Sequence, residues 1–210
     1  PESVKLLGGE RYCWQVRMWD RRGERSDWSQ PGHFSTALHS NDWTADWITP
    51  ALLSSPKKGR RKSSSYPTWW MRRTLVMDEV PERAALSIVC LGYYELYVNG
   101  KRVGDEPLAP AVAKLDKRGL CVTHEIAPLL RKGENCIAVW CASGWYLPHQ
   151  FRVHEGSTPL IRLQAYSREG ENLQTLFGSD AGWNVREANR RITGSWNWNT
   201  FGGEAVDGRG

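Results

Sequence analysis

The chain has 210 residues and an ordinary hydrophobic content of 40%, so it can bury a sizeable core as one or two domains. Its net charge of +5 equals the charge of one basic run at residues 57–62, and the remaining charges balance. A nucleic-acid-binding domain spreads Lys and Arg over a surface, so this distribution argues against a nucleic-acid partner.

Tryptophan is unusually frequent, with 12 residues against 4 Phe, and 20 Gly and 11 Pro favour many short strands joined by turns. The five Cys are odd in number and include no CxxC, which argues against a disulfide framework or a zinc site. Most of them lie in apolar runs, where we expect small buried hydrophobes. No apolar run is long enough to span a bilayer, so no membrane partner is expected, and no signal peptide is visible.

Residues 1–38 predict two strands separated by a turn at residues 20–23. In the first strand, Tyr12, Trp14, Val16 and Met18 share one face, because apolar residues alternate there. The pattern YxWxVRxWDxxGxxSxWSxPxxFxT is similar to the last two strands of a fibronectin type III module. Two strands cannot stand alone, so we expect the other strands of that module outside this sequence. The alternative is a hairpin that packs on the next domain.

A connector and a loop follow. Residues 39–50 carry Trp43 and Trp47, which we expect to anchor a core or an interface rather than to bind a ligand. Residues 54–67 are rich in Ser and basic residues and are bounded by Pro, which predicts a solvated loop. A weaker alternative for this basic loop is attraction to an acidic surface such as an anionic polysaccharide.

The clearest local prediction is a β-hairpin in residues 91–105, because Asn99-Gly100 suits a two-residue type I′ turn. The opposed pairs would be Val98–Lys101, Tyr97–Arg102 and Leu96–Val103. Opposed residues share a face, so we expect Leu96 and Val103 in the core, and Tyr97 and Arg102 on the other face, with the guanidinium over the ring. The run at residues 84–90 predicts a third strand of the same nucleus.

Later segments predict further strands, with one helical turn in residues 126–135 and a second hairpin around residues 167–172. The apolar run Cys136–Cys141 is typical of a strand buried on both sides. About ten strands over ~140 residues predict an all-β chain in which residues 39–210 form a jelly-roll-like β-sandwich.

Five motifs carry a family resemblance. In chain order they are GYYELYVNGKRVGD (92–105), THEIAPLLRKGEN (123–135), GWY (144–146), DAGWNVR (180–186) and FGGEAVDGR (201–209). Together they make residues 42–210 resemble the N-terminal accessory domain of bacterial α-L-rhamnosidases. Departures from the family pattern lie at residues 111–114, at Glu125 and in the loop around residues 142–148. Because these differences fall in loops, the resemblance implies the fold more firmly than a sugar site.

The resemblance implies a role in a bacterial glycosidase, for which secretion or a periplasmic location stays open. The family releases terminal α-L-rhamnose with inversion, using two carboxyl groups in a helical toroid that lies C-terminal to this region. The present sequence holds no such toroid, so no catalytic residue is assigned to it. We expect it to brace the catalytic domain of the parent chain and to bind a rhamnose-containing oligo- or polysaccharide. The alternative is a purely structural packing module without a ligand.

Exposed aromatic rings and a few fixed polar groups are the usual means of sugar recognition. The candidate carbohydrate-binding residues are Trp145, Tyr146, Trp196, Trp198, Glu204, Asp207 and Arg209. For each Trp the alternative is core or interface packing, and for the two acidic residues it is an ion pair with Arg209 or a contact with a neighbouring domain. Some accessory domains of the family bind rhamnose with a calcium ion, so calcium is a possible ligand here, although no cofactor is required and no metal ligands are assigned.

Overall fold

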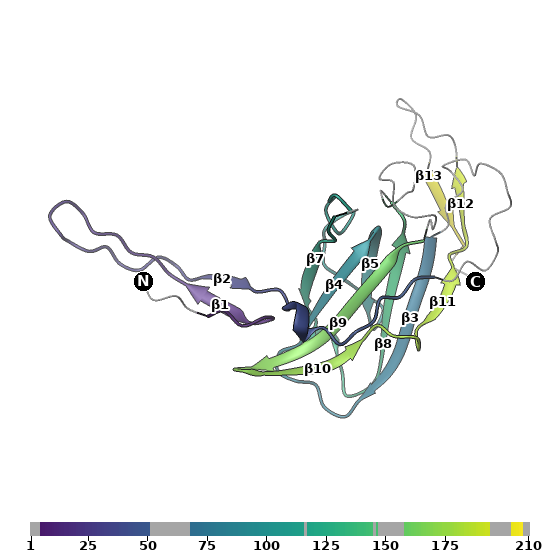
Figure 1. Ribbon diagram of the computed structural model, residues 1–210, viewed down its shortest axis with the longest axis horizontal. Helices are drawn as coiled ribbons and strands as arrows, with labels where there is room; N and C mark the ends of the chain where they lie inside the picture. Colours follow the sequence, from purple (N-terminus) through teal and green to yellow (C-terminus); the bar gives the residue numbers. More distant parts are fainter. Residues whose placement is uncertain are drawn as a thin grey trace.

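The computed structural model describes residues 5–50, 68–115, 117–144, 146, 158–193 and 203–207, and shows two antiparallel β-sheets packed as a sandwich (Figure 1). The strand order is β10-β9-β4-β7 in one sheet and β11-β3-β8-β5-β6 in the other. The all-β sandwich expected from the sequence is therefore confirmed, while the jelly-roll connectivity stays a prediction. None of the helical segments in these ranges is long and apolar enough to cross a membrane.

The strands have the following bounds. The four-stranded sheet contains β4 (Ala85–Leu91), β7 (Cys121–Glu125), β9 (Leu160–Glu169) and β10 (Asn172–Gly178). The five-stranded sheet contains β3 (Thr68–Met77), β5 (Tyr93–Val98), β6 (Lys101–Val103), β8 (Gly133–Ala142) and β11 (Asn184–Glu187). Two short pairs lie outside the sheets: β1 (Arg11–Trp14) with β2 (Gly32–Ser35), and β12 (Arg190–Thr193) with β13 (Gly203–Val206). Two 3-10 turns are η1 (Ser40–Asp42) and η3 (Ala127–Leu129).

The core lies between the two sheets and follows the alternation of strand residues. In β8, Ile137, Val139 and Cys141 are buried against the opposite sheet, whereas Ala138 and Trp140 lie on the other face and are only partly buried. The prediction that residues 136–141 are buried on both sides is therefore wrong. The sequence of this run suggested burial on both faces because its outward-facing positions also carry apolar side chains. These side chains lie on the outer face of the sheet, where no second layer covers them fully.

The predicted hairpin is confirmed in its turn and its register. Asn99 and Gly100 both have positive φ, at 52° and 79°, and the three opposed pairs are those expected. The strand predicted at residues 84–90 is present as β4, but the three-strand nucleus is wrong, because β4 belongs to the other sheet. The chain changes sheets at Gly92, whose φ is 136° and where a Cβ atom would lie 2.4 Å from the Ala142 carbonyl oxygen. Only glycine fits such a conformation and such an approach.

The Asn99 side chain fixes the hairpin to the rest of the five-stranded sheet. Its Nδ2 donates hydrogen bonds to the Leu129 carbonyl oxygen and to Asn135 Oδ1, both at 2.8 Å. Its Oδ1 accepts a hydrogen bond from the backbone N–H of Cys136 at 2.9 Å. A single turn residue thus ties the hairpin to β8 and to the 3-10 turn η3, which matches the helical turn predicted there.

Residues 7–38 form an arm that extends from one end of the sandwich (Figure 1). The two strands predicted in this segment are present as β1 and β2, which pair antiparallel. The base of the arm approaches the sandwich, where a Cβ atom on Gly9 would lie 2.6 Å from the Tyr166 ring. Farther out, large apolar side chains are exposed, with Trp14 at 51% and Met18 at 73%. The expectation that further strands of this module cover them stays a prediction.

Buried Gln164 of β9 attaches the connector to the sandwich. Its Oε1 accepts hydrogen bonds from the backbone N–H groups of Thr44 and Ala45, at 2.7 and 3.0 Å, and its Nε2 donates to the Asp42 carbonyl oxygen at 2.8 Å. Nearby, the Arg162 guanidinium lies 5.0 Å from the Trp43 ring centroid. Trp43 is therefore an anchor, as predicted, whereas 47% of Trp47 is exposed.

The five cysteines are all free thiols. Cys90 and Cys141 are buried in the core, and burial raises the pKa of both, as expected for inert hydrophobes. Cys13 and Cys121 are exposed, so the expectation of burial does not hold for every cysteine in an apolar run. The basic loop at residues 54–67 lies outside the described residues.

We expect Gln164→Leu to lower the free energy of unfolding by about 2 kcal/mol, because the buried N–H group of Ala45 and the partly buried N–H group of Thr44 would lose their acceptor. Urea unfolding followed by far-UV circular dichroism measures this loss. Gln174→Leu, on the exposed face of β10, is the matched control and should leave stability within about 0.5 kcal/mol. Equal effects of the two variants would contradict the role given to Gln164.

A second expectation concerns Asp180, which accepts a hydrogen bond from Arg73 of β3 and another from the Gly182 N–H. The Arg73 hydrogen bond is the main cause that lowers the pKa of Asp180 below its ordinary value of 3.8. The carboxylate therefore stabilises the fold above that pH, and this contribution is lost as the pH falls through the lowered pKa.

We accordingly expect Asp180→Asn to lower the thermal midpoint at pH 7, with a difference from the native chain that shrinks steadily below pH 4. Thermal unfolding across a pH series measures it. Asp78→Asn, at an exposed position after β3, should show no such pH-dependent difference.

Candidate functional site

The outer face of the five-stranded sheet carries a groove of about 710 Å³. Its floor is made by the small side chains of Cys136 and Ala138 on the central strand β8. Larger side chains rise on both sides, because Ala138 is paired with Arg72 of β3 and with Tyr97 of β5. The hollow follows directly from two small residues placed between rows of long ones on one face of a pleated sheet.

Three aromatic rings gather along this groove. Trp70 of β3 stacks on Trp140 of β8 with ring centroids 5.1 Å apart and an interplanar angle of 12°. Tyr97 lies 5.8 Å from Trp70 at a tilt of 51°. Trp70 and Tyr97 line the groove, and the Trp140 ring packs against one face of the Trp70 ring. The arrangement holds an apolar ring surface in a fixed orientation beside an open hollow.

Hydrogen bonding fixes the polar end of the Tyr97 ring. Tyr97 Oη donates a hydrogen bond to Glu95 Oε2 at 2.5 Å, and Glu95 Oε1 lies 3.8 Å from the Arg102 guanidinium. Burial and then the Glu95 carboxylate raise the pKa of Tyr97 to about 12, while Arg102 opposes the shift. The phenol is therefore protonated at neutral pH, and Glu95 is already engaged by a donor and a cation.

The groove itself carries positive charge. Arg72 and Arg186 line it and are exposed, together with the amide side chain of Asn184. None of the described lining residues is Asp or Glu. Hydrolysis of a glycosidic bond in most glycosidases needs two carboxyl groups on either side of that bond, and the described lining residues supply no such pair.

The sequence-predicted candidates lie elsewhere or outside the described residues. Tyr146 is only 8% exposed, its N–H donates to the Ser143 carbonyl oxygen at 2.8 Å, and burial raises the pKa of its phenol. Asp207 is exposed, and its N–H donates to the Asn189 carbonyl oxygen at 2.9 Å. Neither residue lines the groove.

The structure describes the remaining candidates only in part. Glu204 is described only as part of β13, where its backbone pairs with Ile192. The candidates outside the described residues are Trp145, Trp196, Trp198 and Arg209. Their roles stay predictions.

The sequence does contain a pattern from which some of the groove residues could have been predicted. The alternation in residues 68–77 places Trp70 and Arg72 on one face, opposite the face of Trp69 and Met71. Trp140 was hidden by the interpretation of its strand as buried on both sides. Tyr97 was assigned to the outer face correctly, but nothing local to the hairpin tells which strands lie next to it.

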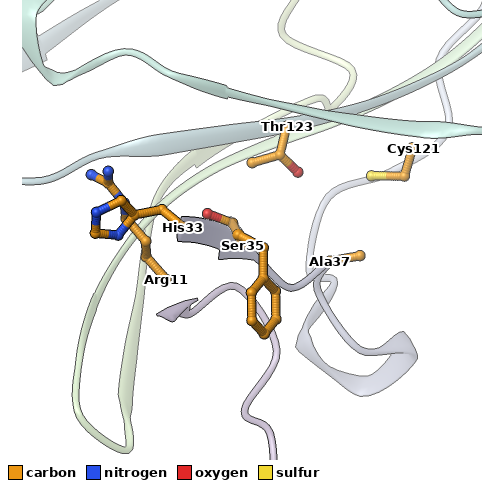
Figure 2. A pocket seen from close by; sticks show the side chains of 7 residues that line it. Arg11, His33, Ser35, Ala37, Cys121 and Thr123 are labelled. Atoms are coloured by element: carbon orange, nitrogen blue, oxygen red, sulfur yellow. The ribbon is translucent and has the colours of Figure 1, made fainter. Parts of the chain in front are cut away.

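A second hollow, of about 510 Å³, lies where the arm meets β7 (Figure 2). Figure 2 shows Thr123 and Cys121 on the β7 side, and Arg11, His33, Ser35 and Ala37 on the arm side. Among the described residues, Phe34 is the one Phe, Tyr or Trp that lines it, and Phe34 stacks on Tyr12 with ring centroids 5.4 Å apart. The groove on the sheet face has two such lining rings, Trp70 and Tyr97, and is therefore the stronger candidate site.

Among the described side chains, no group of three His, Cys, Asp or Glu residues comes together in a way that could hold a metal ion. The calcium ion implied by the family resemblance therefore has no assigned ligands, and calcium dependence stays an expectation.

Comparison with known proteins places the chain in a family. The family model described as the alpha-L-rhamnosidase N-terminal domain matches residues 79–210. The chain belongs to this family. A second model, described as the Rha78A-like N-terminal immunoglobulin domain, matches residues 2–40, where the last strands of a fibronectin-like sandwich were predicted. The resemblance inferred from the five motifs is thus confirmed.

Curated relatives named alpha-L-rhamnosidase are similar over most of this chain. One from Formosa agariphila is 28% identical over 99% of this chain and 24% of its own length. One from Alteromonas sp. is 30% identical over 89% of this chain and 21% of its own length. The chain therefore spans about a quarter or less of the relatives it matches, and corresponds to an N-terminal region of an α-L-rhamnosidase.

Solved structures of α-L-rhamnosidases are also similar to this chain. The alpha-L-rhamnosidase from Dictyoglumus thermophilum matches with a TM-score of 0.73 and 26% identity, over 89% of this chain and 21% of that one. The enzyme from Aspergillus terreus also has a TM-score of 0.73, at 23% identity over 90% of this chain and 22% of that one, which bears on the fold alone.

The stacked pair can be tested through its coupling energy. We expect a double-mutant cycle of Trp70→Ala and Trp140→Ala to give an interaction of about 1 kcal/mol, as found for aromatic pairs beyond their buried area. Urea unfolding of the native chain, both single variants and the double variant measures it. Pairing Trp70→Ala with Trp28→Ala on the arm should be additive, and additivity of Trp70 with Trp140 would contradict the stack.

Proposed function

We propose that this chain is the non-catalytic accessory region of an inverting α-L-rhamnosidase, that it braces the catalytic domain of its parent chain, and that it holds a rhamnose-containing oligo- or polysaccharide. Membership of the N-terminal domain family supports the place in the enzyme. The names of the curated relatives support the substrate class.

The observation that carries the sugar-binding part is the groove on the five-stranded sheet. Rhamnose is a 6-deoxy sugar, so its methyl group and ring C–H groups form an apolar side that suits the Trp70 ring. Its hydroxyl groups need fixed donors and acceptors, and Asn184 and Arg72 stand beside the ring. An aromatic platform with a few polar groups at its rim is the usual composition of a sugar site.

The non-catalytic part rests on the chemistry of the groove. Inversion needs an acid and a base on opposite sides of the glycosidic bond, with about 6.5–9.5 Å between the two carboxyl groups. Trp70, Arg72 and Asn184 supply no such pair, and Glu95 is engaged by Tyr97 and Arg102. The catalytic carboxyl groups would then belong to the domain that this region braces.

The test is a calorimetric titration of the 210-residue chain with a rhamnose oligosaccharide, with calcium and with EDTA. We expect saturable binding that falls about tenfold or more in Trp70→Ala, because the ring supplies the stacking surface. Trp28→Ala, which removes an exposed Trp of the arm, should bind as the native chain does. Weaker binding in EDTA than in calcium would show that the sugar site requires calcium.

Two results would contradict the proposal. A flat titration from a chain that is folded by circular dichroism would refute sugar binding and leave only the bracing role. Release of rhamnose from an aryl rhamnoside by this chain alone would refute the non-catalytic assignment.

A further inference from the structure

We propose that the groove on the five-stranded sheet recognises an acidic oligosaccharide, in which a sugar carboxylate pairs with Arg72 beside the sugar unit that stacks on Trp70. This inference rests on the proposed function and specifies its ligand. It adds to sugar binding a particular chemical class, a glycan that contains uronic acid.

The position of Arg72 is the first reason. It is exposed on the groove side of β3, and within the described part of the chain its side chain forms no hydrogen bond or ion pair with another residue. A guanidinium offers five N–H donors in a planar fork that matches a carboxylate with two parallel hydrogen bonds. Arg72 therefore presents an unused carboxylate-binding group at the edge of an aromatic platform.

The balance of charge around the groove is the second reason. Arg186 is a second cation in the lining, and no described lining residue is acidic. The nearest carboxylate on this face of β5, Glu95, accepts a hydrogen bond from Tyr97 and lies beside Arg102. Because Glu95 is already engaged, no described carboxylate in the lining compensates the Arg72 guanidinium, and its positive charge favours an anionic ligand.

The spacing along β3 is the third reason. Trp70 and Arg72 lie two residues apart on the same face, which separates their Cα atoms by about 7 Å. Ala138 faces Arg72 across the strand pair and leaves room beside it. One sugar unit can therefore lie on Trp70 while the carboxylate of its neighbour meets Arg72.

The probe is an oligosaccharide of alternating rhamnose and galacturonate, compared with the same oligosaccharide after its carboxyl groups are reduced to alcohols. We expect the acidic form to bind about tenfold more tightly at low salt, because the Arg–carboxylate pair is charge-assisted. The difference should narrow in 1 M NaCl, where the screening length falls to about 3 Å. A sulfated rhamnose oligosaccharide should not exceed the binding of the carboxylated form.

Arg72→Gln should bring the affinities for the acidic and reduced forms together, so that the preference for the acidic form is lost. Arg72→Lys should retain part of the preference, because it keeps the charge and loses the fork. Arg118→Gln, at an exposed Arg near β7 on the other sheet, is the matched control and should behave as the native chain.

The outcomes separate this inference from the proposed function. Equal binding of the acidic and reduced forms, unaffected by Arg72→Gln, would overturn the acidic ligand and leave sugar binding intact. A preference for the sulfated oligosaccharide over the carboxylated one would overturn the carboxylate assignment. Absence of binding to every form, by a chain that is folded by circular dichroism, would overturn the proposed function itself.

Discussion

The pairing of β8 with both β3 and β5 is the constraint on which the sandwich and its groove depend. Side chains alternate along β8, so one register sends Ile137 and Val139 into the core and sets Cys136 and Ala138 beneath the groove. A slip of one residue would exchange the two sets and lose core and groove together. The core and the groove are therefore specified by the same backbone hydrogen bonds.

The groove lies on a sheet face, away from the positions that depart from the family pattern. Those departures fall at residues 111–114, at Glu125, which ends strand β7 and does not lie in a loop as expected, and around residues 142–148. None of the described residues at these positions lines the groove. Side chains on paired strands are held more rigidly than side chains on loops. Variation in the loops can therefore alter other contacts while the aromatic face keeps its geometry.

The features that could be predicted from the sequence are those that depend on interactions between residues close together in the chain. The hairpin register followed from Asn99-Gly100 alone, because turn chemistry acts over a few residues. The sheet to which β4 belongs could not be derived in this way, since that choice depends on the bend at Gly92 and on partners far along the chain. Trp70 and Trp140 meet only through the pairing of β3 with β8, so the site was not visible in either segment by itself.

The hydrogen bonds of Gln164 also bear on where this domain begins. Family similarity starts at residue 79, yet β3 lies before that point and supplies Trp69, one of the largest fully buried side chains. Farther upstream, the backbone from Asp42 to Ala45 completes the hydrogen bonding of a buried amide. The packed structure thus extends upstream at least to Asp42, and the boundary given by sequence similarity at residue 79 lies inside it.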